Sequence, residues 1–133
     1  MNKKISIFIP IILAGGLGTR LRSVVHDRPK VLALINEKPF ITIILSQLAH
    51  EGFEKVIISI GYLGDMIKQT IGEEYQGLKI TYFKENEPLG TGGAIKNIAK
   101  FIKQNYILVI NGDTFHNIER KKLISIVKDK NDV

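Results

Sequence analysis

The stretch "IILAGGLGTRLRSVVHDRPK", from Ile11 to Lys30, joins an apolar run to a glycine-rich turn and then to several basic residues. The turn holds three glycines within four positions, Gly15, Gly16 and Gly18. A backbone without side chains can approach a ligand closely, and successive N–H groups in such a turn form a concave site for anions. The stretch therefore predicts a buried strand that leads directly into an anion-binding turn.

The residues after the glycines narrow down the kind of anion. Thr19 can donate a hydroxyl hydrogen bond, and Arg20 offers a planar fork that suits phosphate oxygens. The two commonest nucleotide motifs are absent: no G-x-x-x-x-G-K-[ST] string occurs, and Leu21 stands where a dinucleotide fingerprint needs its third glycine. We predict a polyphosphate cradle of another type. The simpler alternative is a tight strand-to-helix turn with incidental basic residues.

Short apolar runs alternate with helical patterns along the rest of the chain. Runs rich in isoleucine and valine predict strands that are covered on both faces. We expect strands over residues 5–13, 55–60, 79–83 and 106–110. We expect helices from Pro39 to a stop at Gly52 and over residues 64–71, 92–103 and 119–130. This alternation implies right-handed βαβ units, so the predicted fold class is α/β with a mostly parallel sheet.

Three finer expectations concern single positions. Pro10 lacks a backbone donor, so we expect the regular ladder of the first strand to begin at Ile11. In the helix over residues 92–103, an inner stripe is expected to hold Ala94, Ile95, Ile98, Ala99 and Ile102. The last helix should bury Leu123, Ile124 and Val127. The basic triplet over residues 120–122 is expected to form a solvated helix face.

Three unusual segments follow predicted strands: residues 14–22, residues 85–93 and residues 111–113. In an open parallel sheet, ligands bind at the carboxyl ends of the strands. We therefore expect these segments to converge on one edge of the sheet and to form a single binding site there.

The string from Leu13 to Leu21, together with Pro29 and Lys30, resembles the signature of the sugar-1-phosphate nucleotidyltransferases. The resemblance covers about residues 11–113. It implies a three-layer, Rossmann-like nucleotidyltransferase fold of the GT-A type. It also implies that a nucleoside triphosphate and a sugar 1-phosphate condense to a nucleotide-sugar and pyrophosphate, in the biosynthesis of cell-surface polysaccharide.

The resemblance implies a role for each matching residue. The glycine-rich turn would wrap the triphosphate, through Leu13, Ala14, Gly15, Gly16, Gly18, Thr19 and Arg20. Arg20 would stabilise the leaving pyrophosphate, and Lys30 would contact the α-phosphate and the attacking sugar phosphate. Asp113 would bind the catalytic Mg²⁺, an ion that prefers one or two carboxylates together with phosphate oxygens. From residues alone, Asp113 could equally belong to a plain Asn-Gly-Asp turn.

The string "ENEPLGTGGA", residues 85–94, resembles the base-recognition loop of the family. The backbone from Gly90 to Gly93 would lie against the base, with Gly90 and Thr91 as the predicted binding residues. Glu85 favours guanine, because one carboxylate can accept both N1–H and N2–H, whereas uracil and thymine offer a single donor on that edge. The alternative for Glu85 is a solvent-exposed loop acid. The strings most resemble the guanylyltransferases of the family, which implies heptose or mannose 1-phosphate as acceptor.

Composition sets outer limits on these interpretations. The chain has 133 residues, no cysteine and a formal charge of +6. The length suits one small domain, and the absence of cysteine agrees with a reducing cytoplasm. The positive charge suggests anionic partners, but an aromatic stacking surface and a clustered basic groove for nucleic acid are missing. The basic and apolar start, residues 2–13, could alternatively be a signal peptide, although no apolar run is long enough to span a membrane.

The catalytic domains of the family are usually longer. We therefore expect residues 1–133 to be the nucleotide-binding half of a single nucleotidyltransferase domain, truncated at the C-terminus, without the sugar pocket and a second metal-binding aspartate. A sheet cut short exposes an edge, so homo-oligomerisation is expected. Two alternatives stay open: a nucleotide-binding remnant without turnover, and guanylyl transfer to another acceptor such as a molybdenum cofactor.

Overall fold

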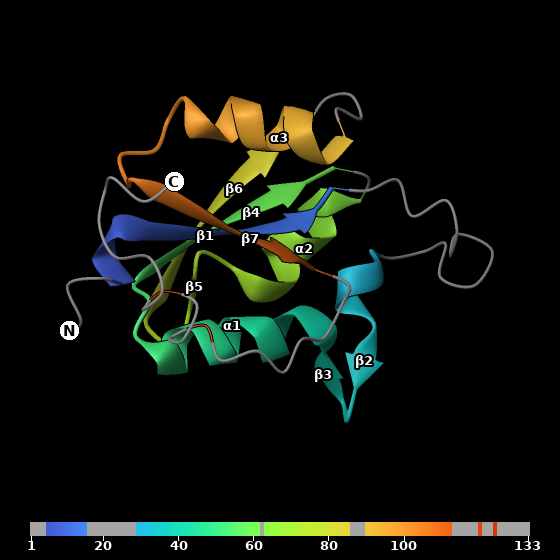
Figure 1. The fold of residues 1–133 in the computed structure, drawn as a ribbon. Helices are drawn as coiled ribbons and strands as arrows, with labels where there is room; N and C mark the ends of the chain where they lie inside the picture. Colours follow the sequence, from blue (N-terminus) through green and yellow to red (C-terminus); the bar gives the residue numbers. More distant parts are fainter. Residues whose placement is uncertain are drawn as a thin grey trace.

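The computed structural model describes residues 5–15, 29–61, 63–85 and 90–112, together with Arg120 and Ile124. Within these ranges the chain forms a five-stranded sheet of order β5-β6-β4-β1-β7 and a small β2–β3 hairpin (Figure 1). The strands are β1 Phe8–Ala14, β2 Leu34–Ile35, β3 Lys38–Pro39, β4 Lys55–Ile60, β5 Glu74–Tyr75, β6 Leu78–Lys84 and β7 Tyr106–Asn111. The helices are α1 Phe40–Glu51, α2 Gly64–Ile71 and α3 Gly90–Ala99, with short 3-10 helices at Ile5–Ile7 and Lys30–Leu32.

The strand β1 lies between β4 and β7 and runs parallel to both of these neighbours. Its pairing with β4 begins at Ile11, as expected from Pro10, but its pairing with β7 begins three residues earlier at Phe8. The expectation was therefore right for one neighbour and wrong for the other. Backbone donors along a strand alternate between its two neighbours, so a proline removes a donor on one side only.

Helices cover both faces of the sheet, which gives the three layers of an α/β fold (Figure 1). Ile12 packs with Leu45 of α1 in the larger apolar core, to which α2 also contributes Ile67. On the opposite face, Ile11 packs with Ile98 of α3 in a second cluster. Because β1 and β4 are covered on both faces, they read as nearly continuous apolar runs in the sequence rather than as alternating ones.

The predicted strands and helices up to residue 112 are present, with shifts at their ends, whereas only Arg120 and Ile124 of the helix expected over residues 119–130 are described. β4 and α2 have the expected bounds, and α1 ends at Glu51, where the expected stop Gly52 is the C-cap with a left-handed φ of 101°. Pro39 immediately precedes α1 as its N-cap and closes β3. The helix expected over residues 92–103 runs from Gly90 to Ala99 instead, and Ala99 is exposed rather than part of the inner stripe. It ends early because the chain tightens into a turn, in which the Phe101 N–H donates to the Ile98 carbonyl (2.9 Å).

Several short elements were not expected from the sequence. The first of them, Ile5–Ile7, was predicted as strand and is a 3-10 helix. In the β2–β3 hairpin, Asn36 and Glu37 both have positive φ values, 51° and 69°, as a two-residue turn of this kind requires. Elements of two or three residues are too short to carry a periodic signal, which is why the sequence pattern missed them.

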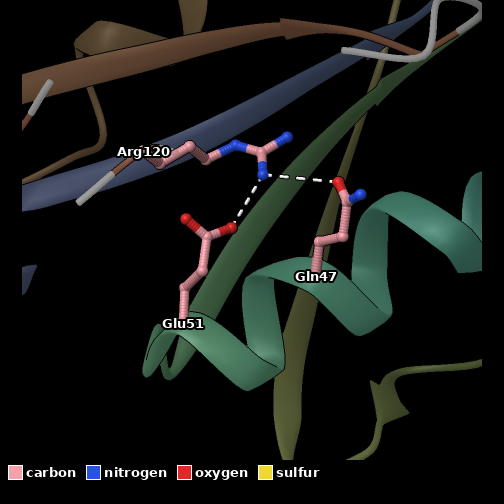
Figure 2. Close-up of polar contacts among 3 residues, drawn as sticks. All are labelled: Gln47, Glu51 and Arg120. Atoms are coloured by element: carbon pink, nitrogen blue, oxygen red, sulfur yellow. Dashed lines mark hydrogen bonds and ion pairs between the residues drawn. The ribbon is translucent and has the colours of Figure 1, made fainter. Parts of the chain in front are cut away.

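Arg120 corrects a further expectation. Its side chain is only 7% exposed, and Nη1 lies 2.7 Å from Oε1 of Glu51 and 3.4 Å from Oε1 of Gln47 (Figure 2). Gln47 and Glu51 are four residues apart on α1, so their side chains reach the same partner. The expected solvated face is thus wrong at Arg120, and residues 121 and 122 lie outside the described residues.

Of the inner face expected for the last helix, Ile124 is buried in the larger core, while Leu123 and Val127 lie outside the described residues. Among the residues that the structure describes, every helix is too short or too polar to cross a membrane.

Candidate functional site

The carboxyl ends of the parallel strands meet at one edge of the sheet, as predicted. Near the end of β1, Leu13 is in register with Ser59 of β4 and with Asn111 of β7. The chain leaving β7 is tied to β1, because the Gly112 N–H donates to the Leu13 carbonyl (3.0 Å). The chain leaving β6 is tied to β4 in the same way, through the Glu85 N–H and the Ile60 carbonyl (2.8 Å). The described parts of the three segments therefore converge.

Gly15, the first residue of the glycine-rich turn, is closely enclosed at this edge. A β-carbon built on Gly15 would lie 3.3 Å from Cδ and from Oε1 of Glu85. On the other side, a β-carbon on Gly61 would lie 2.6 Å from the Gly15 carbonyl oxygen, a distance that real β-carbons do not adopt. The backbone at Gly15 thus lies close to β4 because Gly61 lacks a side chain, while a side chain on Gly15 would press against the end of the Glu85 side chain.

Glu85 lies where β6 ends, and its carboxylate points back over the sheet edge. It is half-buried, and the Ser59 hydroxyl donates a hydrogen bond to its Oε1 (3.3 Å). This contradicts the alternative of a freely solvated loop acid, since the carboxylate has a partner within the fold. Contact between Glu85 and a nucleotide base stays a prediction.

The Pro29–Lys30 segment reaches the same edge from another part of the chain. It opens the 3-10 helix Lys30–Leu32, in which the Leu32 N–H donates to the Pro29 carbonyl (3.0 Å). The next residue, Val31, is buried, and its Cγ1 would lie 3.0 Å from a β-carbon on Gly112. The backbone of Lys30 therefore lies beside the end of β7, directly before the position of Asp113.

The remaining predicted site residues divide into two groups. Gly90, with a φ of 71°, and Thr91 form the first turn of α3. Five lie outside the described residues: Gly16, Gly18, Thr19, Arg20 and Asp113. Within the described part of the chain, no group of three or more metal-ligating side chains occurs, so Mg²⁺ binding stays a prediction that rests on Asp113.

Two residues at this edge, Ser59 and Gly61, were not predicted as part of the site. Each has a weak sequence feature from which it could have been predicted. Ser59 is the one hydroxyl in the apolar part of "KVIISI", and Gly61 follows that strand at the position where ligands bind in parallel sheets.

The chain is similar to known proteins over most of its length. The family model described as nucleotidyl transferase matches residues 9–133. D-glycero-alpha-D-manno-heptose 1-phosphate guanylyltransferase of Campylobacter jejuni subsp. jejuni serotype O:2 is 50% identical over 113 residues, which are 85% of this chain and 51% of that protein. The protein of the same name from Aneurinibacillus thermoaerophilus is 46% identical over 113 residues, 85% of this chain and 49% of that protein. The chain thus spans about half the length of these relatives.

Solved structures agree with these matches. HddC from Yersinia pseudotuberculosis superimposes with a TM-score of 0.82 at 43% identity, covering 91% of this chain and 54% of that chain. The same protein complexed with GMP-PN superimposes with a TM-score of 0.81 over the same shares of both chains. The expected α/β fold with a mostly parallel sheet is therefore confirmed.

Proposed function

The chain belongs to the nucleotidyl transferase family, and we propose that it transfers the guanylyl group of GTP to heptose 1-phosphate or mannose 1-phosphate. The observation that carries the proposal is the meeting of Gly15, Glu85 and Gly112 at one edge of the sheet. These three positions open the glycine-rich turn, the segment predicted to recognise the base, and the segment that begins with Asp113. The similarity to heptose 1-phosphate guanylyltransferases supports the choice of nucleotide and of acceptor.

The reaction is a displacement at phosphorus. A phosphate oxygen of the sugar 1-phosphate bonds to the α-phosphorus of GTP, and the bond from that phosphorus to the bridging oxygen of the β-phosphate breaks. The electron pair leaves with pyrophosphate, so negative charge builds up on the leaving group. In our proposal Arg20 stabilises that charge, the backbone from Gly15 onward binds the triphosphate, and Lys30 holds the α-phosphate and the attacking phosphate together.

We propose that a magnesium ion binds at this edge of the sheet. Gly112 is buried between Leu13 and Val31, which fixes the backbone immediately before Asp113. One carboxylate at that point is a suitable protein ligand for Mg²⁺, which completes its coordination with phosphate oxygens and water. When bound, the ion would neutralise part of the phosphate charge. Asp113 is its proposed ligand.

The proposal extends to the setting of the enzyme. We assign the activity to the cytoplasm, where nucleoside triphosphates and sugar phosphates are made, and to nucleotide-sugar synthesis for cell-surface polysaccharide. We also propose self-association, because β7 ends the described sheet and Val109 on that strand is exposed.

The test begins with equilibrium binding of GTP, UTP and ATP in the presence of Mg²⁺. We expect the chain to prefer GTP, and Glu85→Gln to reduce that preference about 10- to 100-fold, because the amide places a donor opposite a guanine donor. Glu54→Gln is the matched control, since Glu54 is exposed before β4, at the opposite edge of the sheet. An unchanged preference in Glu85→Gln would refute the role of Glu85.

Turnover is measured next, as pyrophosphate release from GTP with heptose 1-phosphate or with mannose 1-phosphate. Release with either acceptor supports the transferase. Selective GTP binding without release under any of these conditions would favour the nucleotide-binding remnant instead. No binding of any nucleotide by folded protein would overturn the proposal.

A further inference from the structure

Ser59 interrupts an otherwise apolar run in β4, and we propose that it is a positioning residue that orients the Glu85 carboxylate toward the nucleotide base. The inference rests on the proposed function, because it assigns the effect of Ser59 to base selection. It adds a residue that contacts neither phosphate nor base and acts through Glu85.

The burial of Ser59 requires a hydrogen-bonding partner. The residue is 1% exposed and lies on the α3 face of the sheet, in register with Leu13 of β1 and Phe83 of β6. A hydroxyl in such surroundings is costly unless it is hydrogen-bonded, and an aliphatic residue would be cheaper at this position. The hydroxyl donates to Oε1 of Glu85 at 3.3 Å. The buried hydroxyl of Ser59 in β4 is thus hydrogen-bonded to Glu85, the acid that is predicted to recognise the base.

The other contacts of Glu85 fix its place but not its rotation. Its backbone is held by the hydrogen bond to Ile60 (2.8 Å), and its Cδ and Oε1 lie beside Gly15, which has no side chain to hold them. The terminal torsion of a glutamate is broad and nearly two-fold, so packing alone leaves the carboxylate free to turn. The Ser59 hydroxyl selects one orientation because it binds one of the two oxygens.

Orientation matters more for guanine than for uracil. Guanine presents N1–H and N2–H side by side, so both carboxylate oxygens must lie along the edge of the base. Uracil presents a single donor and accepts a wider range of carboxylate orientations. Each carboxylate oxygen has two acceptor sites, so Oε1 can keep the Ser59 hydrogen bond while it accepts one from a base. Loss of the hydroxyl should therefore weaken GTP binding and leave UTP binding unchanged.

The test measures the affinities for GTP and UTP of the full chain with Ser59→Ala, Ser59→Cys and Ser59→Ala/Glu85→Gln. We expect Ser59→Ala to lower GTP affinity about three- to tenfold with UTP affinity unchanged. Ser59→Cys keeps the shape of the side chain with a weaker donor, so its GTP affinity should lie between those of the wild type and Ser59→Ala. Ser46→Ala, on α1 at the other face of the sheet, is the matched control and should change neither affinity.

The double variant separates a positioning role from a general structural one. If Ser59 acts through Glu85, the double variant keeps the GTP-to-UTP ratio of Glu85→Gln alone. Equal losses for GTP and UTP in Ser59→Ala, or additive losses in the double variant, would overturn the inference. If the ratio falls in Glu85→Gln but not in Ser59→Ala, the inference fails and the proposed function stands. If the wild-type chain has no preference for GTP, both fail.

Discussion

Two glutamates of this protein accept hydrogen bonds from buried polar side chains on opposite faces of the sheet. On the face covered by α1, Glu51 accepts from Arg120, whose side chain is 7% exposed (Figure 2). On the face covered by α3, Glu85 accepts from Ser59, which is 1% exposed. The first partner carries a charge and the second is neutral.

This difference decides what each carboxylate can do. The charges of Glu51 and Arg120 offset each other at 2.7 Å, so the pair joins α1 to the last part of the chain and has little left to offer a ligand. The Ser59 hydroxyl orients Glu85 without neutralising it, so Glu85 keeps its charge and most of its acceptor capacity. A neutral partner is therefore the arrangement expected at a binding site, and a charged partner is the one expected within the fold.

The largest effect that separates the two regions is expected from Arg120→Met. Removing one member of a buried pair leaves the other unpaired, so we expect the free energy of unfolding to fall by about 3 kcal/mol. Urea denaturation measures this loss. Replacing both residues, as in Arg120→Met/Glu51→Met, should recover much of it, because the remaining charge is also gone.

Arg120→Met should lower stability without affecting nucleotide selection at the candidate site. The ratio of GTP to UTP affinity should be unchanged in folded Arg120→Met. A changed ratio, or a loss below about 0.5 kcal/mol, which is typical of surface substitutions, would mean that the two regions do not differ as described.

A medium effect is expected at the sheet edge from Gly61→Ala. The added carbon would lie 2.6 Å from the Gly15 carbonyl oxygen, so the backbone must shift. We expect a loss of about 1–3 kcal/mol in the free energy of unfolding, together with weaker GTP binding, because the shift displaces the start of the glycine-rich turn.

Gly92→Ala is the matched control for the stability of this variant, and its GTP binding is not compared because Gly92 lies in the segment predicted to recognise the base. Nothing lies within 4 Å of a β-carbon at Gly92, which is in α3. Alanine is the better helix former, so this variant should gain up to about 1 kcal/mol. Thermal and urea unfolding measure the stability of both variants. Equal changes in the free energy of unfolding would show that Gly61 is not packed against Gly15 as the structure has it.

The smallest effect is expected from breaking an ion pair at the surface, between Lys84 and Asp65. Lys84, the residue before Glu85, pairs with Asp65 at 3.2 Å, and their side chains are 52% and 71% exposed. Water and salt screen such a pair, so Asp65→Asn should cost no more than about 0.5 kcal/mol. Urea denaturation at low and high salt measures this cost. A loss as large as that of Arg120→Met would show that burial does not explain the difference in stability between the two ion pairs.

The sequence by itself determined the elements whose patterns are local. The strand β4 and the helix α2 have the predicted bounds. In runs of this length, the apolar composition and the spacing of apolar residues indicate both the type of element and its buried face. The convergence of the strand ends also followed from the sequence, since parallel strands joined by helices must bring their carboxyl ends to one edge.

Only the tertiary structure decided which polar groups meet. Ser59 and Glu85 are 26 residues apart, and Arg120 and Glu51 are 69 apart. The sequence made Arg120 a solvated residue and left Ser59 unremarked, because the period of a helix or strand shows which face is apolar but not which distant side chain lies opposite. The partner of a buried polar group depends on the packing of whole elements, and that packing appears only when the chain has folded.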